Sequence, residues 1–237
     1  MSTKPDKAFI LAAGMGTRLR PHTDTIPKPM VEIAGKSIIH RTLEKLAAEG
    51  VKEVVVNTHH LANVLEKHLK ETSGPKIIIS HEEELLDTGG GLKKALHYFG
   101  DEPYYIINGD ALWDDKTPNA LQRLANAWDP SKMDILLLLQ SVATMSVTHG
   151  VGDYHLQADG KVKRARKRDA AFMFAGLRIA HPRIFKDSPD GAFSFLSLMD
   201  KAETEDKLYA VSHDDAWYHI STPEDLAAVN KLFKERA

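Results

Sequence analysis

Short, mainly apolar runs alternate with helix-like stripes along the first half of the chain. The apolar runs have the length of buried strands and cover residues 8–13, 54–57, 77–80 and 104–108. Between them, apolar residues recur at helical spacing, first at Ile39, Leu43 and Leu46 and then at Leu61, Leu65 and Leu69. A further helix is expected at about residues 90–98. This alternation with short connections predicts right-handed crossovers and a doubly wound, mainly parallel α/β sheet with helices on both faces.

The second half of the chain is less regular. Residues 135–139, 172–179 and 208–211 have the composition of strands, and residues 193–202 that of a helix. An Asp159-Gly160 turn between weakly alternating segments predicts a surface hairpin over residues 153–166. Thr222, followed by Pro223 and Asp225, predicts the start of a last helix. We expect a single domain over residues 1–237, in which both halves share one sheet and the hairpin is a small antiparallel insertion.

Composition and charge narrow the class of protein. Hydrophobic residues make up 43% and charged residues 27% of the chain, which excludes a disordered or collagen-like protein. The formal net charge of −2 provides no overall positive field for a nucleic-acid backbone. Because the sequence contains no cysteine, disulfides, thiolate nucleophiles and cysteine zinc sites are excluded. Since residues 1–7 are polar and no apolar run approaches the ~20 residues that cross a bilayer, we expect a cytoplasmic protein with no membrane and no nucleic-acid partner.

The most informative stretch follows the first predicted strand. Residues 11–21 read Leu-Ala-Ala-Gly-Met-Gly-Thr-Arg-Leu-Arg-Pro, and Pro-Lys-Pro follows at 27–29. In an open parallel sheet, ligands collect at the carboxyl ends of the strands, where this loop begins. Gly14 and Gly16 allow the main chain to approach a phosphate closely, while Arg18 and Lys28 supply positive charge, so we interpret the stretch as a polyphosphate cradle. Neither a Gly-x4-Gly-Lys-Ser/Thr loop nor the third glycine of a dinucleotide fingerprint is present, which disfavours an ATPase or a hydride-transfer enzyme.

Two further stretches belong to the same edge of the predicted sheet. Asn108-Gly109-Asp110 follows the fourth strand, and the carboxylate of Asp110 beside a triphosphate would suit Mg²⁺, which takes few protein oxygens. Residues 89–91 are three consecutive glycines ahead of a predicted helix. Such a run is a poor helix start unless something flat or anionic packs against it, and a flexible turn is the alternative.

Residues 11–29 resemble the N-terminal signature of the sugar-1-phosphate nucleotidyltransferases, Leu-Ala-Ala-Gly-x-Gly-Thr-Arg-Leu-x-Pro with a following Pro-Lys. The resemblance implies a Rossmann-like fold and an enzyme that condenses a sugar 1-phosphate with a nucleoside triphosphate and releases pyrophosphate. It implies that Arg18 and Lys28 contact the phosphates as catalytic residues and that Asp110 holds Mg²⁺. The nucleotide-binding loop would consist of Leu11, Ala13, Gly14, Gly16 and Thr17.

Further fragments extend the resemblance to the base and the sugar. They imply that Gly89 and Gly90 lie against the base, with Glu84 as a partner for its polar edge, and that Asn108 and Gly176 contact the sugar. The Thr-Gly-Gly-Gly form at residues 88–91 is most similar to the N-acetylmuramate-1-phosphate uridylyltransferases of cell-wall (peptidoglycan) recycling, which implies UTP. A mannose-1-phosphate guanylyltransferase or a related NDP-sugar pyrophosphorylase is the alternative. The nucleotide-binding half would cover about residues 1–115 and the sugar-binding half about 116–237.

One stretch departs from the pattern of this family. A Trp-x-Asp-Val/Ile-Gly-Thr-Pro segment normally supplies a second metal carboxylate, but residues 217–223 read Trp-Tyr-His-Ile-Ser-Thr-Pro, with His219 in place of the Asp and Ser221 in place of the Gly. Imidazole suits Mn²⁺ or another transition metal better than Mg²⁺. Three interpretations are open: His219 binds the metal, Asp214 or Asp215 replaces it, or the site has one protein carboxylate. The departure also keeps open a non-catalytic nucleotide-sugar sensor.

A basic run at residues 161–168 contains Lys161, Lys163, Arg164, Arg166, Lys167 and Arg168. A solvated rim and a contact with an anionic acceptor are equally good interpretations. The run lacks the interleaved aromatic residues of an RNA-binding surface. We expect a monomer or a small homo-oligomer.

Overall fold

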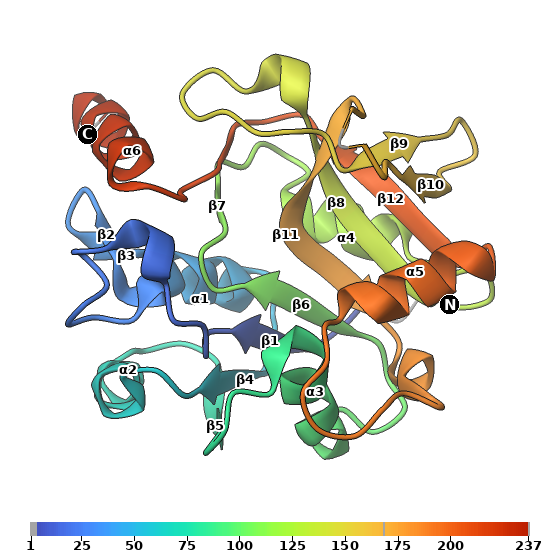
Figure 1. The fold of residues 1–237 in the computed structure, drawn as a ribbon, viewed down its shortest axis with the longest axis horizontal. Helices are drawn as coiled ribbons and strands as arrows, with labels where there is room; N and C mark the ends of the chain where they lie inside the picture. The colour runs from blue at the N-terminus through green and yellow to red at the C-terminus, as the bar shows by residue number, and fades with distance from the viewer. Residues whose placement is uncertain (1–3, 168, 237) are drawn as a thin grey trace.

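The structure, a computed structural model, describes residues 4–167 and 169–236 and centres on a nine-stranded sheet (Figure 1). Its main path runs β10-β9-β11-β6-β1-β4-β5, and β8 pairs with both β11 and β12. The strands of this sheet are β1 (Lys7–Leu11), β4 (Glu53–Thr58), β5 (Lys76–His81), β6 (Tyr104–Asn108), β8 (Ile135–Ser141), β9 (Tyr154–Leu156), β10 (Val162–Arg164), β11 (Phe172–Ala180) and β12 (Leu208–His213). The expected mainly parallel α/β fold is confirmed.

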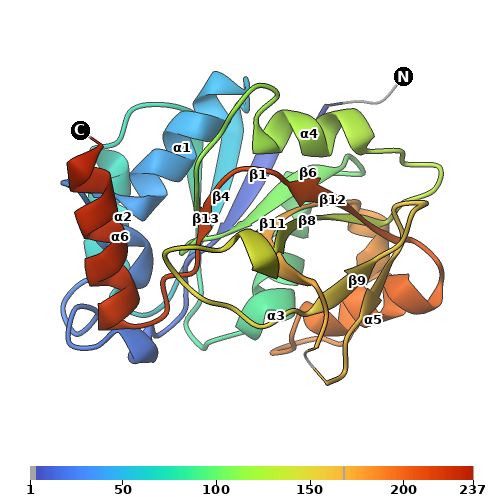
Figure 2. The same cartoon turned by 90° about the horizontal axis from the view of Figure 1, so that it is seen from above.

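The first half forms the parallel part of the sheet. β1 lies between β4 and β6, with Ala8 opposite Val54 on one side and Tyr105 on the other. Because both faces of β1 are covered, its central residues are all buried, which explains a continuous apolar run rather than alternation. Figure 2 shows helices on both faces of the sheet. They are α1 (Ile38–Ala48), α2 (Ala62–Lys70) and α4 (Ala120–Ala127) on one face, and α3 (Asp87–Lys94) and α5 (Leu196–Thr204) on the other.

The second half adds antiparallel strands to the same sheet. β11 runs antiparallel to β6 and β8, and β12 returns parallel to β8. The predicted hairpin is present, since β9 and β10 pair with Tyr154 opposite Arg164. The register of β11 with β8 shifts between Phe174 and Arg178, and Gly176 within this shift has a φ of +82°. Along the chain, β11 pairs with β9 at Phe172, before the shift, and with β6 from Leu177 to Ala180.

The ends of several helices agree with the sequence. Thr222 and Asp225 form a capping box at the start of α6 (Pro223–Glu235), as predicted. Two predicted helix starts are wrong: α3 begins at Asp87 rather than at residue 90, and α5 begins at Leu196 rather than at residue 193. The residues just before α5 form instead a loop that packs on α3. Short ladders join β2 (Glu32–Ile33) to β3 (Lys36–Ser37) and β7 (Leu112–Trp113) to β13 (Trp217–Tyr218).

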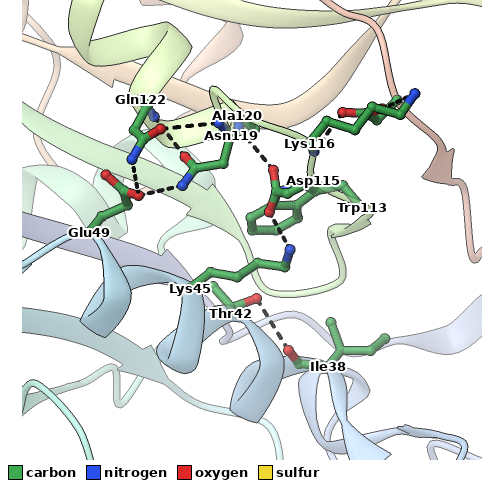
Figure 3. A network of polar contacts seen from close by, with 11 residues as sticks. Ile38, Thr42, Lys45, Glu49, Trp113, Asp115, Lys116, Asn119, Ala120 and Gln122 are labelled. Carbon is green, nitrogen blue, oxygen red and sulfur yellow. Dashed lines mark hydrogen bonds and ion pairs between the residues drawn. The ribbon is translucent and has the colours of Figure 1, made fainter.

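A polar network holds α1 against the connection between β7 and α4 (Figure 3). Lys45 pairs with Asp115, whose carboxylate also accepts hydrogen bonds from the indole of Trp113 at 3.0 Å and from the backbone of Ala120 at 2.9 Å. Nearby, the carboxylate of Glu49 accepts hydrogen bonds from side chains of the α4 cap. The network fixes the position of the chain just beyond Asp110.

Among the described residues, no helix combines the length and apolar character that crossing a bilayer requires.

Candidate active site

A cavity of about 410 Å³ opens at the carboxyl ends of β1, β4 and β6. Such an edge is the usual ligand site of an open parallel sheet. Most of the loop residues predicted from the sequence to bind the nucleotide line this cavity, together with residues that were not predicted. Its lining includes Leu11, Ala12, Ala13, Gly14, Gly16, Lys28, Asn57, Leu85, Asp87, Thr88, Asn108 and Asp110.

The loop after β1 is shaped by its own hydrogen bonds. The backbone N–H of Ala12 donates to Oδ1 of Asn57 at 2.7 Å, which ties the loop to the end of β4. Gly16 has a φ of +62°, and its carbonyl accepts hydrogen bonds from the backbone of Leu19 at 3.0 Å and from the hydroxyl of Thr23 at 2.8 Å. A Cβ at Gly16 would stand 3.1 Å from Cγ2 of Thr23, so the turn has no room for a larger residue. The loop thus holds a fixed curve around the cavity.

Lys28 and Asp110 face each other across this cavity. Nζ of Lys28 lies 2.5 Å from Oδ2 of Asp110, and the side chains are 12% and 38% exposed. Lys28 belongs to a 3-10 turn (Lys28–Met30), while Asp110 follows β6. A cation and a carboxylate at one opening can hold, respectively, a phosphate oxygen and a cation bound to it.

A second cavity of about 230 Å³ adjoins the first at Asn108 and Asp110. It brings together Arg18, Gly176 and His219, three residues selected from distant parts of the sequence. Thr17 starts the 3-10 turn that carries Arg18, but its own exposed side chain lines neither cavity.

His219 is held in place from two sides. Its backbone N–H donates to the hydroxyl of Thr148 at 2.8 Å, and Nε2 lies 2.7 Å from Oγ of Ser221. The two residues that depart from the family pattern therefore contact each other. Burial lowers the pKa of His219, and the charges of Asp110 and Asp225 oppose this effect. The imidazole is therefore neutral at neutral pH, the form that can bind a metal.

The donor groups at this junction limit what kind of metal site it can be. Within the described residues, no three His, Asp or Glu side chains gather closely enough to hold a metal alone. Asp214 pairs with Arg123 and Asp215 with Lys116, and neither residue lines the cavities, which counts against the interpretation that one of them replaces the missing Asp. One carboxylate with open space beside it fits Mg²⁺, because Mg²⁺ usually takes one or two carboxylates together with substrate phosphates and water.

The glycine run lies inside α3 and packs on the protein itself. A Cβ at Gly89 would stand 2.4 Å from the ring of Phe193, and one at Gly90 would stand 2.2 Å from the carbonyl oxygen of Gly191. The N–H of Gly89 donates to the carbonyl of Phe193 at 2.8 Å. The absence of side chains thus allows the loop ahead of α5 to lie on the first turn of α3. In the structure the wall of the first cavity at this point is formed by Leu85, Asp87 and Thr88 rather than by Gly89 or Gly90.

Glu84 is exposed and does not line the cavities. The buried carboxylate of this segment belongs to Glu82, which is 1% exposed. It accepts hydrogen bonds from Nδ2 of Asn57 at 2.7 Å and from the backbone of Leu86 at 2.9 Å. Sequence reasoning missed both Asn57 and Glu82. Asn57 gave a usable signal, a polar residue at the carboxyl end of an otherwise apolar strand, whereas nothing in the sequence separates Glu82 from its acidic neighbours.

A third cavity of about 620 Å³ continues from the first through Thr88 and Asn108. It lies between β11, the β9–β10 hairpin and the start of α5, and its lining includes Arg164, Arg166 and Arg178. Nη2 of Arg164 lies 2.8 Å from the carboxylate of Asp200. Of the basic run, Lys161 instead pairs with Asp206 at 3.1 Å, and Arg168 lies outside the described residues. Sequence reasoning did not select Arg178.

Comparisons with known proteins agree with this geometry. Residues 7–146 match the family model described as nucleotidyl transferase. The chain is 39% identical over 239 residues to the N-acetylmuramate alpha-1-phosphate uridylyltransferase of Caulobacter vibrioides, covering 98% of this chain and 99% of the relative. It is 40% identical over 229 residues to the mannose-1-phosphate guanylyltransferase catalytic subunit beta of Danio rerio, covering 92% of this chain and 62% of the relative. The solved structure of a UDP-glucose pyrophosphorylase complexed with UDP-glucose superposes on this chain with a TM-score of 0.81 and 17% sequence identity. The superposition covers 98% of this chain and 100% of that structure, so the two share a fold. The chain belongs to the nucleotidyl transferase family.

Proposed function

We propose that this protein transfers a uridylyl group from UTP to N-acetylmuramate 1-phosphate, giving the nucleotide sugar and pyrophosphate. The observation that carries the proposal is the junction of the cavities, where Arg18, Lys28 and Asp110 surround a space continuous with a larger pocket. The similarity to a uridylyltransferase over 98% of the chain supports this acceptor and this base. The reaction would return a cell-wall sugar to an activated form, which suits peptidoglycan recycling in the cytoplasm.

In the proposed reaction, an oxygen of the sugar phosphate attacks the α-phosphorus of UTP. A new phosphorus–oxygen bond forms as the bond to the β-phosphate breaks, and pyrophosphate leaves with the electron pair. The sugar phosphate is already ionised near neutral pH, so no protein base is required. Arg18 and Lys28 would stabilise the charge on the phosphate oxygens, and the loop after β1 would hold the triphosphate in line with its attacker.

Asp110 would hold Mg²⁺ together with the phosphates of the substrate. When bound, the ion would neutralise charge on the triphosphate. The carboxylate of Asp110 lies beside Lys28 in the structure. This pair would separate on binding, as Lys28 turns to a phosphate and Asp110 to the ion. His219 lines the cavity on the other side of Asp110 and would stand near the ion, where it would favour Mn²⁺ more than a carboxylate does.

The proposal is tested by measuring pyrophosphate release with a panel of nucleotides and acceptors. UTP with N-acetylmuramate 1-phosphate should give the highest kcat/KM. The second candidate is GTP with mannose 1-phosphate, which the 40% identity to a mannose-1-phosphate guanylyltransferase favours. A higher kcat/KM for that pair would replace the first assignment. Calorimetry that detects nucleotide binding without any pyrophosphate release would instead favour a nucleotide-sugar sensor.

A further inference from the structure

Arg178 is a buried cation in the floor of the third cavity. It lies on β11 opposite Ile106 of β6 and is only 4% exposed. Its guanidinium lies between two aromatic rings, 5.1 Å from the centroid of Phe174 and 4.3 Å from that of Phe195. Both rings also line the cavity, so the guanidinium is held in a fixed position beside this space.

No protein anion among the described residues balances this charge. Nε of Arg178 is buried without a hydrogen-bond partner, and Nη1 has only the sulfur of Met199, at 3.6 Å. The groups whose negative charge would raise the pKa of Arg178 are the phenols of Tyr154 and Tyr104. Burial raises the pKa of both phenols, so both are neutral at neutral pH. By contrast, Arg164 of the same cavity has Asp200 as its partner.

A buried unpaired charge is costly, and folded proteins almost always pair it. Burial lowers the pKa of Arg178 to about 10, which still leaves the guanidinium charged at neutral pH. Since the protein supplies no partner, an anion entering the cavity is the natural one. A carboxylate matches the guanidinium best, because the two groups can form a pair of parallel hydrogen bonds.

The position of Arg178 indicates which anion this is. The acceptor phosphate must reach the α-phosphorus near Lys28 and Asp110, where the first two cavities meet. Arg178 is paired with Ile106, two residues before Asn108, and this spacing along a strand is about 7 Å. A sugar with its phosphate at the junction would therefore present its far side to Arg178. N-acetylmuramate carries a lactyl carboxylate there, which mannose and glucose phosphates lack.

We propose that Arg178 binds the carboxylate of an acidic acceptor and thereby selects an acidic sugar 1-phosphate over a neutral one. This inference rests on the proposed function and adds the residue that determines its acceptor specificity. It assigns Arg178 a direct contact with substrate, whereas Arg164 and Arg166 would only add positive charge at the rim.

The test compares kcat/KM for N-acetylmuramate 1-phosphate with that for N-acetylglucosamine 1-phosphate, which lacks only the lactyl group. Arg178→Met should lower kcat/KM for the acidic acceptor about 10- to 100-fold, the loss expected for a charge-assisted hydrogen bond. The kcat/KM for the neutral acceptor and the KM for UTP should stay within about threefold of the wild-type values, a smaller change than the loss expected for the acidic acceptor. Arg178→Lys should show an intermediate loss. Lys52→Gln removes a positive charge at the opposite edge of the sheet, where Lys52 pairs with Asp6, and should leave the preference unchanged.

A second measurement avoids dependence on the folding of the variants. The wild-type enzyme is assayed with N-acetylmuramate 1-phosphate and with its lactamide, in which the carboxylate is replaced by a neutral amide. A clear preference for the acid supports the inference, and equal use of both overturns it while leaving the proposed function intact. Equal losses for acidic and neutral acceptors in Arg178→Met also overturn it. A wild-type enzyme that releases no pyrophosphate with the acidic acceptor overturns the proposed function, and this inference with it.

Discussion

Asp110 and Lys28 each have a partner in the structure that a bound substrate would replace. Their 2.5 Å contact holds both side chains at the lining of the first cavity. Under the proposed function, Lys28 would exchange this contact for a phosphate oxygen and Asp110 for a cation. At the scale of single residues, the consequence is that removing either charge affects the reaction more than the fold.

Asp110→Asn keeps the shape of the side chain and removes its charge. We expect kcat to fall about 100- to 1,000-fold, the range seen when a group that stabilises transition-state charge is lost. The melting temperature should stay near that of the wild type, because Asp110 is partly exposed and not part of the core. Steady-state pyrophosphate release and a thermal melt measure the two effects. A near-normal rate would contradict the role of Asp110.

His219→Asp restores the carboxylate that the family pattern leads one to expect. Because a carboxylate suits Mg²⁺ better than imidazole does, the ratio of Mg²⁺- to Mn²⁺-supported turnover should rise. Mn²⁺ binding in the presence of UTP, followed by electron paramagnetic resonance, should change, because an anionic oxygen donor replaces a neutral nitrogen donor. His97→Asp, at an exposed position after α3, is the control, since it makes the same substitution away from the cavities, and its metal preference should match the wild type. Unchanged preference and unchanged Mn²⁺ binding in His219→Asp would place His219 outside the metal site.

Single residues were predictable where charge, a local motif and chain direction agree. Arg18 and Lys28 were selected for their charge beside a glycine loop and by the family signature, and Asp110 because it follows a strand that ends at the same edge. The three residues line adjoining cavities at that edge. Glu82 and Arg178 were not selected, because their importance comes from burial, which depends on partners far away in the sequence. The carboxylate of Glu82 accepts a hydrogen bond from Asn57, and the guanidinium of Arg178 lies over the ring of Phe195.

The same limit applies to whole elements. The strands of the parallel half were predicted nearly to their ends, because burial on both faces gives an unbroken apolar run. α4 was not predicted, although Asn119 and Gln122 form a capping box at its start, because its apolar stripe spans barely two turns. The start of α3 was placed too late, because consecutive glycines are poor helix formers in isolation. Their close packing on the loop ahead of α5 compensates for that preference.

Gly90→Ala tests this explanation for the glycine run. The added Cβ would meet the backbone oxygen of Gly191 at 2.2 Å, a contact that only a shift of the loop can relieve. We expect a loss of about 1–3 kcal/mol in the free energy of unfolding, as for other overpacked sites. Gly14→Ala is the matched control: a Cβ at Gly14 has no atom within 4 Å, so stability should hardly change. Urea unfolding of both variants measures the difference. Equal stability would show that the loop moves freely, and that packing does not explain the glycines.

At the scale of the whole molecule, one strand joins the two halves of the sheet. β11 pairs with β9 at Phe172, before the bend at Gly176, and with β6 from Leu177 onward, after it. Gly176 lines the second cavity, while Phe174 and Arg178 on either side of the bend line the third. The sequence indicated both β11 and the hairpin, but the order of strands depends on pairings between distant segments that no local pattern encodes. Our proposal that the first half binds the nucleotide and the second half the sugar follows from this arrangement, because the cavity lined by the loop after β1 and the cavity beside the hairpin meet at Asn108.

The two halves of the chain are also joined on the face of the sheet covered by α1 and α4, through the network around Glu49 (Figure 3). The side chain of Glu49 at the end of α1 is only 3% exposed. It pairs with Lys4 at 2.7 Å and accepts hydrogen bonds from Asn119 and from Gln122 at the start of α4. Burial by itself would raise the pKa of Glu49, but these hydrogen bonds outweigh it and lower the pKa below its ordinary value of 4.5.

This lowered pKa has a defined consequence for stability. Because the folded pKa lies below the unfolded one, the contribution of Glu49 is fully present above about pH 4.5 and is lost as pH falls through the folded value. Glu49→Gln should lower the free energy of unfolding by about 1 kcal/mol at pH 7 and make stability less dependent on pH below 4.5. Glu71→Gln, at an exposed position after α2, is the control and should follow the wild-type curve. Urea unfolding from pH 7 down to pH 3 measures these curves. If Glu49→Gln loses stability with acid as steeply as the wild type, then other groups carry the pH dependence, and the network holds the two halves together through geometry rather than through the charge of this carboxylate.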